Sequence, residues 1–388
     1  MPADSAPTIS FRVACFSPYP AAGPSVRHRI KALAPLWRAE GIAVTLMPFM
    51  STRFYKIRKR FDTWGTCLKL AYFVLATIRT MWRVLWVFRF DAVIIHREAF
   101  PLGPAWFERV ICALNRHVFF DVDDAIWVPP SMAINQRKWL SSPNRAADIM
   151  TRSKSVVVGN QFLADYARTF CANVEIIPTS FQDLAPAAIR RADALACPCI
   201  LWIGNEGNAT YLNLVLPALE NVAAMFPFRL RLVGGTDIAQ IRATNFEIEY
   251  CKWSEEWESE WIRSADIGIM PLFDAPYEYG KCGFKLIQYW SAGLPVIASP
   301  IGVNKTYVVP DVNGYLAATD AQWEAAFTAL VAPPDGRATR ARLGQAGRAS
   351  YLAAFTRERA ASRWLDLFAR AGWCRPAQVV RSAKAHSC

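Results

Sequence analysis

The sequence contains no apolar run long enough to cross a bilayer. Its longest apolar segment, residues 68–88, is interrupted by Lys69, Arg79 and Arg83, and only nine residues follow one another without a charge or break. A membrane-spanning helix needs about 20 apolar residues. The first ten residues also lack the basic and apolar regions of a secretory signal. We therefore expect no transmembrane helix and a cytoplasmic protein.

Patterns that bind metals are also scarce. The chain has ten cysteines and four histidines, but its one close cysteine pair is Cys197-Pro198-Cys199, with no second pair and no histidine nearby. Structural zinc sites take four such ligands at characteristic spacings. We expect reduced thiols, no metal and no cofactor.

Four catalytic or nucleotide-binding motifs are missing. The sequence has no G-x-x-x-x-G-K-[ST], no G-x-G-x-x-G, no H-E-x-x-H and no G-x-S-x-G. These absences argue against a P-loop NTPase, an ordinary dinucleotide dehydrogenase, a zinc protease of the H-E-x-x-H type and an α/β-hydrolase.

Positive charge is abundant but local. The net charge is +12, and residues 51–90 hold nine Lys and Arg against one acid, which gives +8. Residues 335–388 hold eleven against three, which again gives +8. Such clusters indicate a polyanionic partner: an anionic membrane, a phosphorylated ligand or nucleic acid.

Apolar segments alternate with helical patterns along the whole chain. Residues 11–17 and 42–49 are predicted strands around a glycine-containing loop and a helix at residues 27–40, which is the βαβ pattern of a parallel sheet. Further strands are expected at residues 91–96, 117–124, 155–160 and 174–179. The pattern breaks at residues 182–198 and restarts with a strand at 200–205, a helix at 208–226 and strands at 229–235, 247–253, 265–272 and 294–299. We predict an α/β protein with two doubly wound, Rossmann-like domains facing a cleft. The expected boundaries are 1–185, 198–350, and a C-terminal helix and basic tail, 351–388, that packs back on the N-domain.

The segment 279–302, YGKCGFKLIQYWSAGLPVIASPIG, combines two lysines with an otherwise apolar pattern. If Phe284 to Ser291 form a helix, the entry at Gly280 to Gly283 presents free N–H groups and the positive end of the helix dipole. Lys281 and Lys285 add charge there, which suits a diphosphate. Gln288, one turn further, can hydrogen-bond a sugar hydroxyl. A solvated helix start with two snorkelling lysines is the alternative.

This segment resembles the nucleotide-sugar motif of GT-B glycosyltransferases of family 4, which often show E-x7-E followed by A-x-G-x-P-V-[IV]-A-[ST]. The resemblance covers about residues 11–316 and is strongest to a bacterial subgroup that assembles cell-surface polysaccharides. The other segments that carry it are SPYPAAGPSVRHRI (17–30), DAVIIHREAFPLGP (91–104), FFDVDDAIW (119–127), VVVGNQFLADYA (156–167), ILWIGNEGNATYL (200–212) and ADIGIMPL (265–272).

Two departures from the family pattern affect the donor site. Gly280 and Gln288 stand where the family usually has glutamates, of which the first commonly contacts the donor sugar and the second the ribose. The Arg and Lys often found after the first strand of the second domain are also absent from residues 202–214. Phosphate binding then falls to backbone amides at residues 204–210 and to Lys281 and Lys285.

The resemblance implies a retaining, metal-independent hexosyltransferase that moves a sugar from a nucleotide diphosphate sugar to a lipid-linked or polysaccharide acceptor. The first domain would hold the acceptor and the second the donor. The site residues expected on this basis are Lys285, Lys281, Asp123 and Asp124 for catalysis; Gly204, Asn205, Gly207, Trp253, Gly283, Phe284 and Gln288 for the donor; and Gly23, Ser25, Arg27, Arg29 and Arg97 for the acceptor.

Several of these residues have other readings. Asp121, Asp123 and Asp124 follow an apolar strand and suit acceptor or sugar contacts, turn capping, or a D-x-D metal site. Arg27 and Arg29 begin a helix against its dipole, which a bound anion or simple solvation explains. Arg97 also suits a structural ion pair with Glu98, Trp253 suits packing as well as base stacking, and His117 suits packing at a strand edge.

The basic and aromatic segment 53–90 suits an interfacial helix on an anionic membrane, with rings at headgroup depth. A helix packed on the sheet or a nucleic-acid surface would also mix these residues. We expect peripheral attachment to the inner face of the cell membrane and no nucleic acid. The alternative functions are a nucleotide-sugar epimerase or phosphorylase of the same fold, or a non-catalytic sugar-nucleotide binding protein on the membrane.

Overall fold

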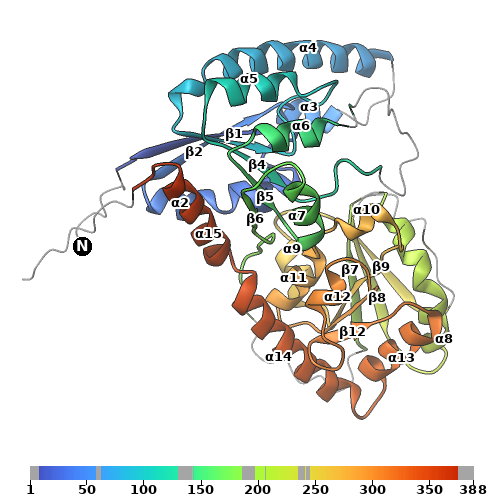
Figure 1. Cartoon of the computed structure of the whole chain (residues 1–388). Coiled ribbons are helices and arrows are strands. Elements are labelled where there is room, and N and C mark those ends of the chain that lie inside the picture. The colour runs from blue at the N-terminus through green and yellow to red at the C-terminus, as the bar shows by residue number, and fades with distance from the viewer. Residues whose placement is uncertain are drawn as a thin grey trace, which may run out of the picture. The chain divides into compact units, whose positions relative to one another are not determined.

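The computed structural model describes residues 8–57, 63–129, 142, 144–185, 197–205, 207–234, 241 and 245–374. The middle of the basic segment (58–62), most of the predicted linker (186–196) and the end of the basic tail (375–388) lie outside these ranges. Two parallel six-stranded sheets with flanking helices form the fold (Figure 1). The predicted doubly wound α/β architecture is therefore confirmed.

The first sheet has the order β2-β1-β3-β4-β5-β6. Its strands are β1 (Phe11–Ser17), β2 (Ile42–Pro48), β3 (Ala92–His96), β4 (Val118–Val122), β5 (Ser155–Val158) and β6 (Val174–Ile176). Every residue of β3, β4 and β5 is buried, as expected for strands covered on both faces.

The second sheet has the order β12-β11-β10-β7-β8-β9. Its strands are β7 (Cys199–Ile203), β8 (Arg229–Gly234), β9 (Glu247–Lys252), β10 (Ile267–Met270), β11 (Val296–Ala298) and β12 (Gly314–Leu316). The sequence analysis did not predict β12, because this strand has only three residues and begins at a glycine directly after a turn.

The chain divides into two compact units, which are described separately. Unit 1 comprises residues 1–101, 106–119 and 361–388, and unit 2 comprises residues 102–105 and 120–360. The helices that lie wholly in unit 1 are α1 (Pro24–Val26), the π-helix η1 (Arg27–Lys31), α2 (Ala34–Ala39), α3 (Thr52–Ile57), α4 (Thr63–Leu85), η2 (Val87–Arg89) and α5 (Trp106–Leu114). Helix α15 (Arg357–Arg370) begins in unit 2 and ends in unit 1. Its Trp364 and Phe368 pack on Trp37, with ring centroids 5.8 and 5.6 Å away.

The helices of unit 2 are α6 (Arg145–Arg152), α7 (Gln161–Arg168), η4 (Ala209–Leu214), α8 (Leu216–Ala223), α9 (Glu258–Arg263), α10 (Pro276–Tyr279), α11 (Phe284–Ser291), α12 (Asn304–Tyr307), α13 (Asp320–Val331) and α14 (Gly336–Ala354). Both faces of the second sheet are covered. Ile200 and Trp202 pack in one core with α8 and α13, whereas Leu201 packs in another with α11 (Figure 1).

Prolines divide two segments that the sequence analysis predicted as single helices. Residues 27–40 form η1 and then α2, which starts anew with Pro35 in its first turn. Residues 208–226 form η4 and then α8, with Pro217 in the first turn of α8. Because proline has no N–H and disfavours a helical conformation in the preceding residue, each helix restarts there.

No helix among the described residues is both long enough and apolar enough to cross a membrane.

Candidate functional site

The edge of the second sheet where its strands end carries the candidate donor site. Helix α11 begins there, at Phe284, as the sequence predicts. Its N-cap is Gly283, at φ 66° in the left-handed region. A Cβ at this position would lie 3.0 Å from Val303 and 3.1 Å from Tyr307, so glycine is required by both backbone and space. The first-turn N–H groups of α11, which have no acceptor within the helix, lie at this edge.

Lys285 lies in the first turn of α11 and is partly buried. Desolvation, followed by the charge of Lys281, lowers the pKa of Lys285 to about 7, while Asp124 acts to raise it. Its Nζ lies 5.6 Å from the ring centroid of the buried Trp202. The ammonium is therefore held in an apolar setting that an anion would relieve.

Lys281 precedes α11 and lies over aromatic rings. Its Nζ is 4.8 Å from the Tyr277 ring centroid and 6.0 Å from that of Tyr211. Since the charge of Lys281 acts on Lys285, the structure brings these two predicted catalytic residues together. Two cations at one helix N-terminus form the concentration of positive charge that a diphosphate needs.

The loop after β4 reaches the same place. The Sγ of Cys282 donates to the carbonyl oxygen of Asp123 at 3.0 Å, and the charge of Asp124 acts on Lys285. The loop that carries Asp123 and Asp124 thus lies near the lysines, whereas Asp121 is buried within β4. Within the described ranges, no three His, Cys, Asp or Glu side chains are placed to hold a metal ion. Metal-independent catalysis stays a prediction.

Gly280 is glycine because of close packing. A Cβ there would lie 2.6 Å from the Cβ of Ala125 and 2.8 Å from its backbone nitrogen. The glutamate that the family pattern places at this position has no room. The backbone is instead held by Asn160, which donates to the carbonyl oxygens of Gly280 at 3.0 Å and Lys281 at 3.2 Å. Asn160 also caps α7 through Leu163 N–H at 2.9 Å.

Gln288 and Trp253 are linked through a residue that the sequence analysis missed. Gln288 is buried, and its Nε2 donates to Oε1 of Glu258 at 3.1 Å. The Nε1 of Trp253 donates to the same oxygen, also at 3.1 Å. Neither contact was predicted, because Glu258 begins α9 and no local pattern relates it to α11.

The loop after β7 carries Gly204, Asn205 and Gly207. A Cβ at Gly204 would lie 2.2 Å from the ring of Trp202, so glycine allows that ring to turn under the loop. Gly207 has φ 82°, again in the left-handed region. The loop is anchored by Tyr211, whose hydroxyl donates to Oε1 of the fully buried Glu278 at 2.5 Å. Burial and this bond raise the pKa of Tyr211, which stays protonated.

The five predicted acceptor residues all lie in unit 1. Arg27 and Arg29 are buried on the π-helix η1, so solvation does not explain them. Nε of Arg27 donates to Nε2 of His28 at 3.1 Å. Short π-helical segments are frequent at functional sites because the extra residue re-aims side chains.

Ser25 lies next to this cluster in the chain. Its hydroxyl is hydrogen-bonded to Nε2 of the fully buried His96 at 2.7 Å. Arg97, which follows His96, has φ 62°, an uncommon conformation for a non-glycine residue and one associated with functional sites. Sequence reasoning did not select His96, although it ends a buried strand. Gly23 allows the preceding turn, since a Cβ would lie 2.9 Å from that of Tyr19.

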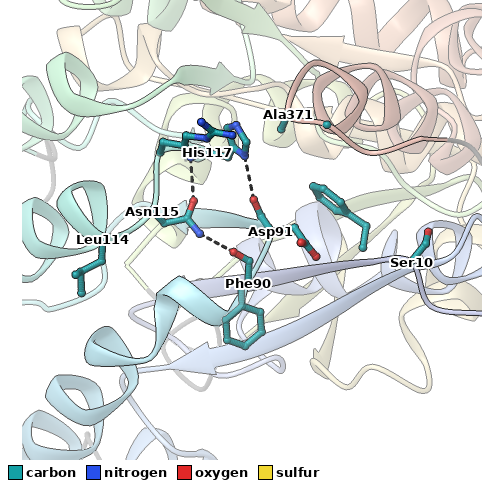
Figure 2. A pocket seen from close by; sticks show the side chains of 10 residues that line it. Ser10, Phe90, Asp91, Leu114, Asn115, His117 and Ala371 are labelled. Atoms are coloured by element: carbon teal, nitrogen blue, oxygen red, sulfur yellow. Dashed lines mark hydrogen bonds between the residues drawn. The ribbon is translucent and has the colours of Figure 1, made fainter.

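A shallow pocket lies in unit 1, at the end of the first sheet where β1, β3 and β4 begin (Figure 2). None of the predicted site residues lines it. Nδ1 of His117 is hydrogen-bonded to the carbonyl oxygen of Asp91 at 3.1 Å, and Asn115 donates to that of Phe90 at 2.7 Å. The backbone contact of His117 is compatible with the packing role predicted for it.

Comparison with known proteins finds a family match within unit 2. Residues 197–332, which contain the lysines, α11 and the loop after β7, match the family model described as glycosyl transferases group 1. A D-inositol 3-phosphate glycosyltransferase of Xylanimonas cellulosilytica is 34% identical over 122 residues, which are 31% of this chain. The match spans 27% of that protein's length.

Solved structures show that the chain has the GT-B fold over 93% of its length. A glycosyltransferase from Rickettsia africae has a TM-score of 0.66 at 14% identity, over 93% of this chain and 98% of its own. Anabaena HepE in complex with UDP and glucose has a TM-score of 0.65 at 12% identity, over 93% and 100%. The predicted fold is therefore confirmed, and the family resemblance is matched over residues 197–332.

Proposed function

We propose that the protein is a retaining, metal-independent glycosyltransferase that moves a sugar from a nucleoside diphosphate sugar to an acceptor. The observation that carries the proposal is the pair Lys281 and Lys285 at the entry to α11, with the pKa of Lys285 lowered to about 7. Desolvation makes the charged form of a lysine unfavourable, and an anion bound at the start of the helix would compensate for it. Anabaena HepE, solved with UDP-glucose, supports the assignment of the anion as a nucleotide diphosphate.

In the proposed reaction the bond between the anomeric carbon and the diphosphate oxygen breaks, and its electron pair leaves with the diphosphate. Lys285, Lys281 and the amides of α11 stabilise this growing negative charge, which is the largest expected contribution to the rate. The acceptor hydroxyl oxygen bonds to the anomeric carbon, and its proton passes to an oxygen of the departing diphosphate. Asp123 and Asp124, on the loop beside the lysines, contact the sugar or the acceptor.

The acceptor is assigned to unit 1 and given an anionic group, such as the phosphate of a lipid-linked glycan. Arg27, Arg29 and Arg97 supply charge there, and two of these guanidiniums are buried. A buried guanidinium group forms strong, charge-assisted hydrogen bonds when its ligand is an anion.

We further propose that the protein attaches to the membrane through α4 and α5. Nη2 of Arg79 donates to the carbonyl oxygens of Phe49 at 2.6 Å and Pro48 at 3.1 Å, and Arg83 also donates to Pro48. These two arginines are turned to backbone carbonyls, and the large exposed side chains of α4 are apolar. The exposed apolar residues of this patch are Trp64, Leu70, Val74, Leu75, Ile78, Met81, Trp82, Leu85 and Phe88 near α4, and Trp106, Val110 and Leu114 on α5.

An exposed apolar face of this size is unusual for a protein with no partner. Interfacial helices bury such a face at the boundary of headgroups and acyl chains. Polysaccharide assembly on a lipid-linked acceptor at the inner face of the cell membrane would use this placement.

The proposed function is tested in two steps with the full chain. A thermal-shift screen against nucleoside diphosphates and their sugars should show stabilisation by one donor, about 2.7 kcal/mol at a concentration 100-fold above Kd. With that donor, free nucleoside diphosphate should appear only when acceptor is added. Release without acceptor indicates an epimerase, phosphorylase or hydrolase, and binding without release indicates a sugar-nucleotide binding protein. No stabilisation by any nucleotide contradicts the proposal.

A further inference from the structure

Glu258 is a buried carboxylate held by two side-chain donors on one of its oxygens. Trp253 Nε1 and Gln288 Nε2 each lie 3.1 Å from Oε1. Both are neutral N–H groups, and the side chain of Glu258 is 6% exposed. Burying a carboxylate is costly unless it is hydrogen-bonded, and a fixed geometry of this kind is typical of a binding group.

The position of Glu258 links it to the phosphate end of the donor site. Trp253 directly follows β9, at the edge of the sheet where β7 ends in the glycine loop. Gln288 lies three residues after Lys285 on α11, so the two side chains share one face of that helix. Glu258 is therefore bonded to a residue that lies one helical turn after Lys285.

The chemistry of a carboxylate selects the part of the donor that it contacts. An ionised carboxylate only accepts hydrogen bonds, so it does not bind the diphosphate. The ribose next to a diphosphate has two adjacent hydroxyls, which are donors at the right separation for one carboxylate. In dinucleotide-binding sheets of related architecture an acidic side chain takes this role with the 2′-hydroxyl.

We propose that Glu258 binds the ribose hydroxyls of the nucleotide donor, with Trp253 and Gln288 as the residues that position it. The proposal rests on the proposed function, since it assumes a nucleotide donor. It also revises the role expected for Gln288. The amide of Gln288 donates to Glu258, and the group that binds the ribose is the carboxylate of Glu258 on α9.

The decisive measurement compares ribonucleotides with 2′-deoxyribonucleotides. We would measure the Kd of the full chain for UDP, ADP and GDP and for their 2′-deoxy forms by titration calorimetry. The protein should prefer the ribose form of its nucleotide by about tenfold, the value of one good hydrogen bond to a charged group. Glu258→Gln keeps the shape and an acceptor oxygen for Trp253 and Gln288, and should reduce this preference to less than about threefold.

Three more variants separate this role from a structural one. Glu260→Gln removes an exposed charge from the same helix and should leave the preference unchanged. Gln288→Met removes the amide that positions Glu258 and should lower the ribose preference while the affinity for inorganic pyrophosphate stays within about twofold. The double variant Glu258→Gln with Gln288→Glu exchanges the two groups within the pair and should restore part of the preference.

The outcomes distinguish the two proposals. If a nucleotide binds but the protein does not prefer ribose, or Glu258→Gln keeps the preference, this inference is overturned and the glycosyltransferase proposal stands. If none of the nucleotides binds, both are overturned.

Discussion

Lys285 is the residue on which the proposed chemistry depends most. Because its ammonium lies beside Lys281 and in an apolar setting, it is poised to stabilise a departing diphosphate. We expect Lys285→Ala to lower turnover at least tenfold, which corresponds to about 1.4 kcal/mol of transition-state stabilisation. Lys305→Ala, at an exposed position of α12, is the matched control and should keep full activity. Near-normal turnover in Lys285→Ala would remove this residue from the mechanism.

The lowered pKa of Lys285 predicts how donor binding depends on pH. With a pKa of about 7, the free protein loses this proton as pH rises through 7, whereas a bound diphosphate favours the protonated form. Donor affinity should therefore fall as pH rises from 6 to 9, by up to about tenfold per unit above the free pKa. A nucleotide sugar is the suitable ligand, because its diphosphate has no group that titrates near 7.

Calorimetry in buffers of different ionisation enthalpy should show proton uptake on binding near pH 8. Lys285→Arg keeps the charge at every pH used and should bind the same donor with little pH dependence. Equal pH dependence in both proteins would assign the titration to another group.

Gly280, where the family pattern has a glutamate, shows what sequence can and cannot predict at a single position. The absence of a glutamate at Gly280 was visible, but its cause, contact with Ala125, lies far away in the chain. Glu258 and Asn160 were missed for the same reason. Asn160 bonds to a carbonyl 120 residues away, and a pattern search within one segment has no access to such a contact.

At the level of elements, the loop that carries Lys281 is tied to α7 by Asn160. Its side-chain oxygen caps α7, and its side-chain nitrogen binds the carbonyls of Gly280 and Lys281. Asn160→Ser keeps a good N-cap but is too short to reach Gly280. We expect the free energy of unfolding of this variant to stay within about 0.5 kcal/mol of that of the unchanged protein, and its turnover to fall.

Asn160→Ala removes both functions and should also destabilise the protein by about 1 kcal/mol. Chemical denaturation and steady-state kinetics of the two variants separate the roles. If Asn160→Ser loses as much stability as Asn160→Ala and keeps its turnover, the residue serves α7 alone.

Strands were the most predictable elements and helices the least. Buried parallel strands are continuous apolar runs, so nearly all of them could be located within one or two residues, from β1 to β11. Helix α11 was also located correctly, because Gly283 and Gly293 bracket it. The divided helices near Pro35 and Pro217 were not, because an amphipathic pattern continues across a proline even when the backbone does not.

For the molecule as a whole, the sequence predicted a basic and aromatic membrane surface at residues 53–90, of which residues 58–62 lie outside the described ranges. The net charge of +12 suits an anionic bilayer, but two arginines of α4 are turned to backbone carbonyls and the large exposed side chains of this helix are apolar. Attachment should then depend mainly on buried apolar area, at about 25 cal/mol per Å², with charge adding a smaller and salt-sensitive part.

This balance is testable by sedimentation of the full chain with vesicles. Leu75 and Trp82 are both 63% exposed, so Leu75→Glu with Trp82→Glu should not disturb folding and should reduce binding to anionic vesicles at least tenfold. Raising the salt from 0.1 to 0.5 M should reduce the vesicle binding of the unchanged protein much less than the two substitutions do. Met225→Glu, in unit 2 and 59% exposed, is the control and should bind normally. If the double variant still binds but binding disappears at high salt, the basic residues are the main contact. If the unchanged protein does not bind anionic vesicles, attachment through this face is contradicted.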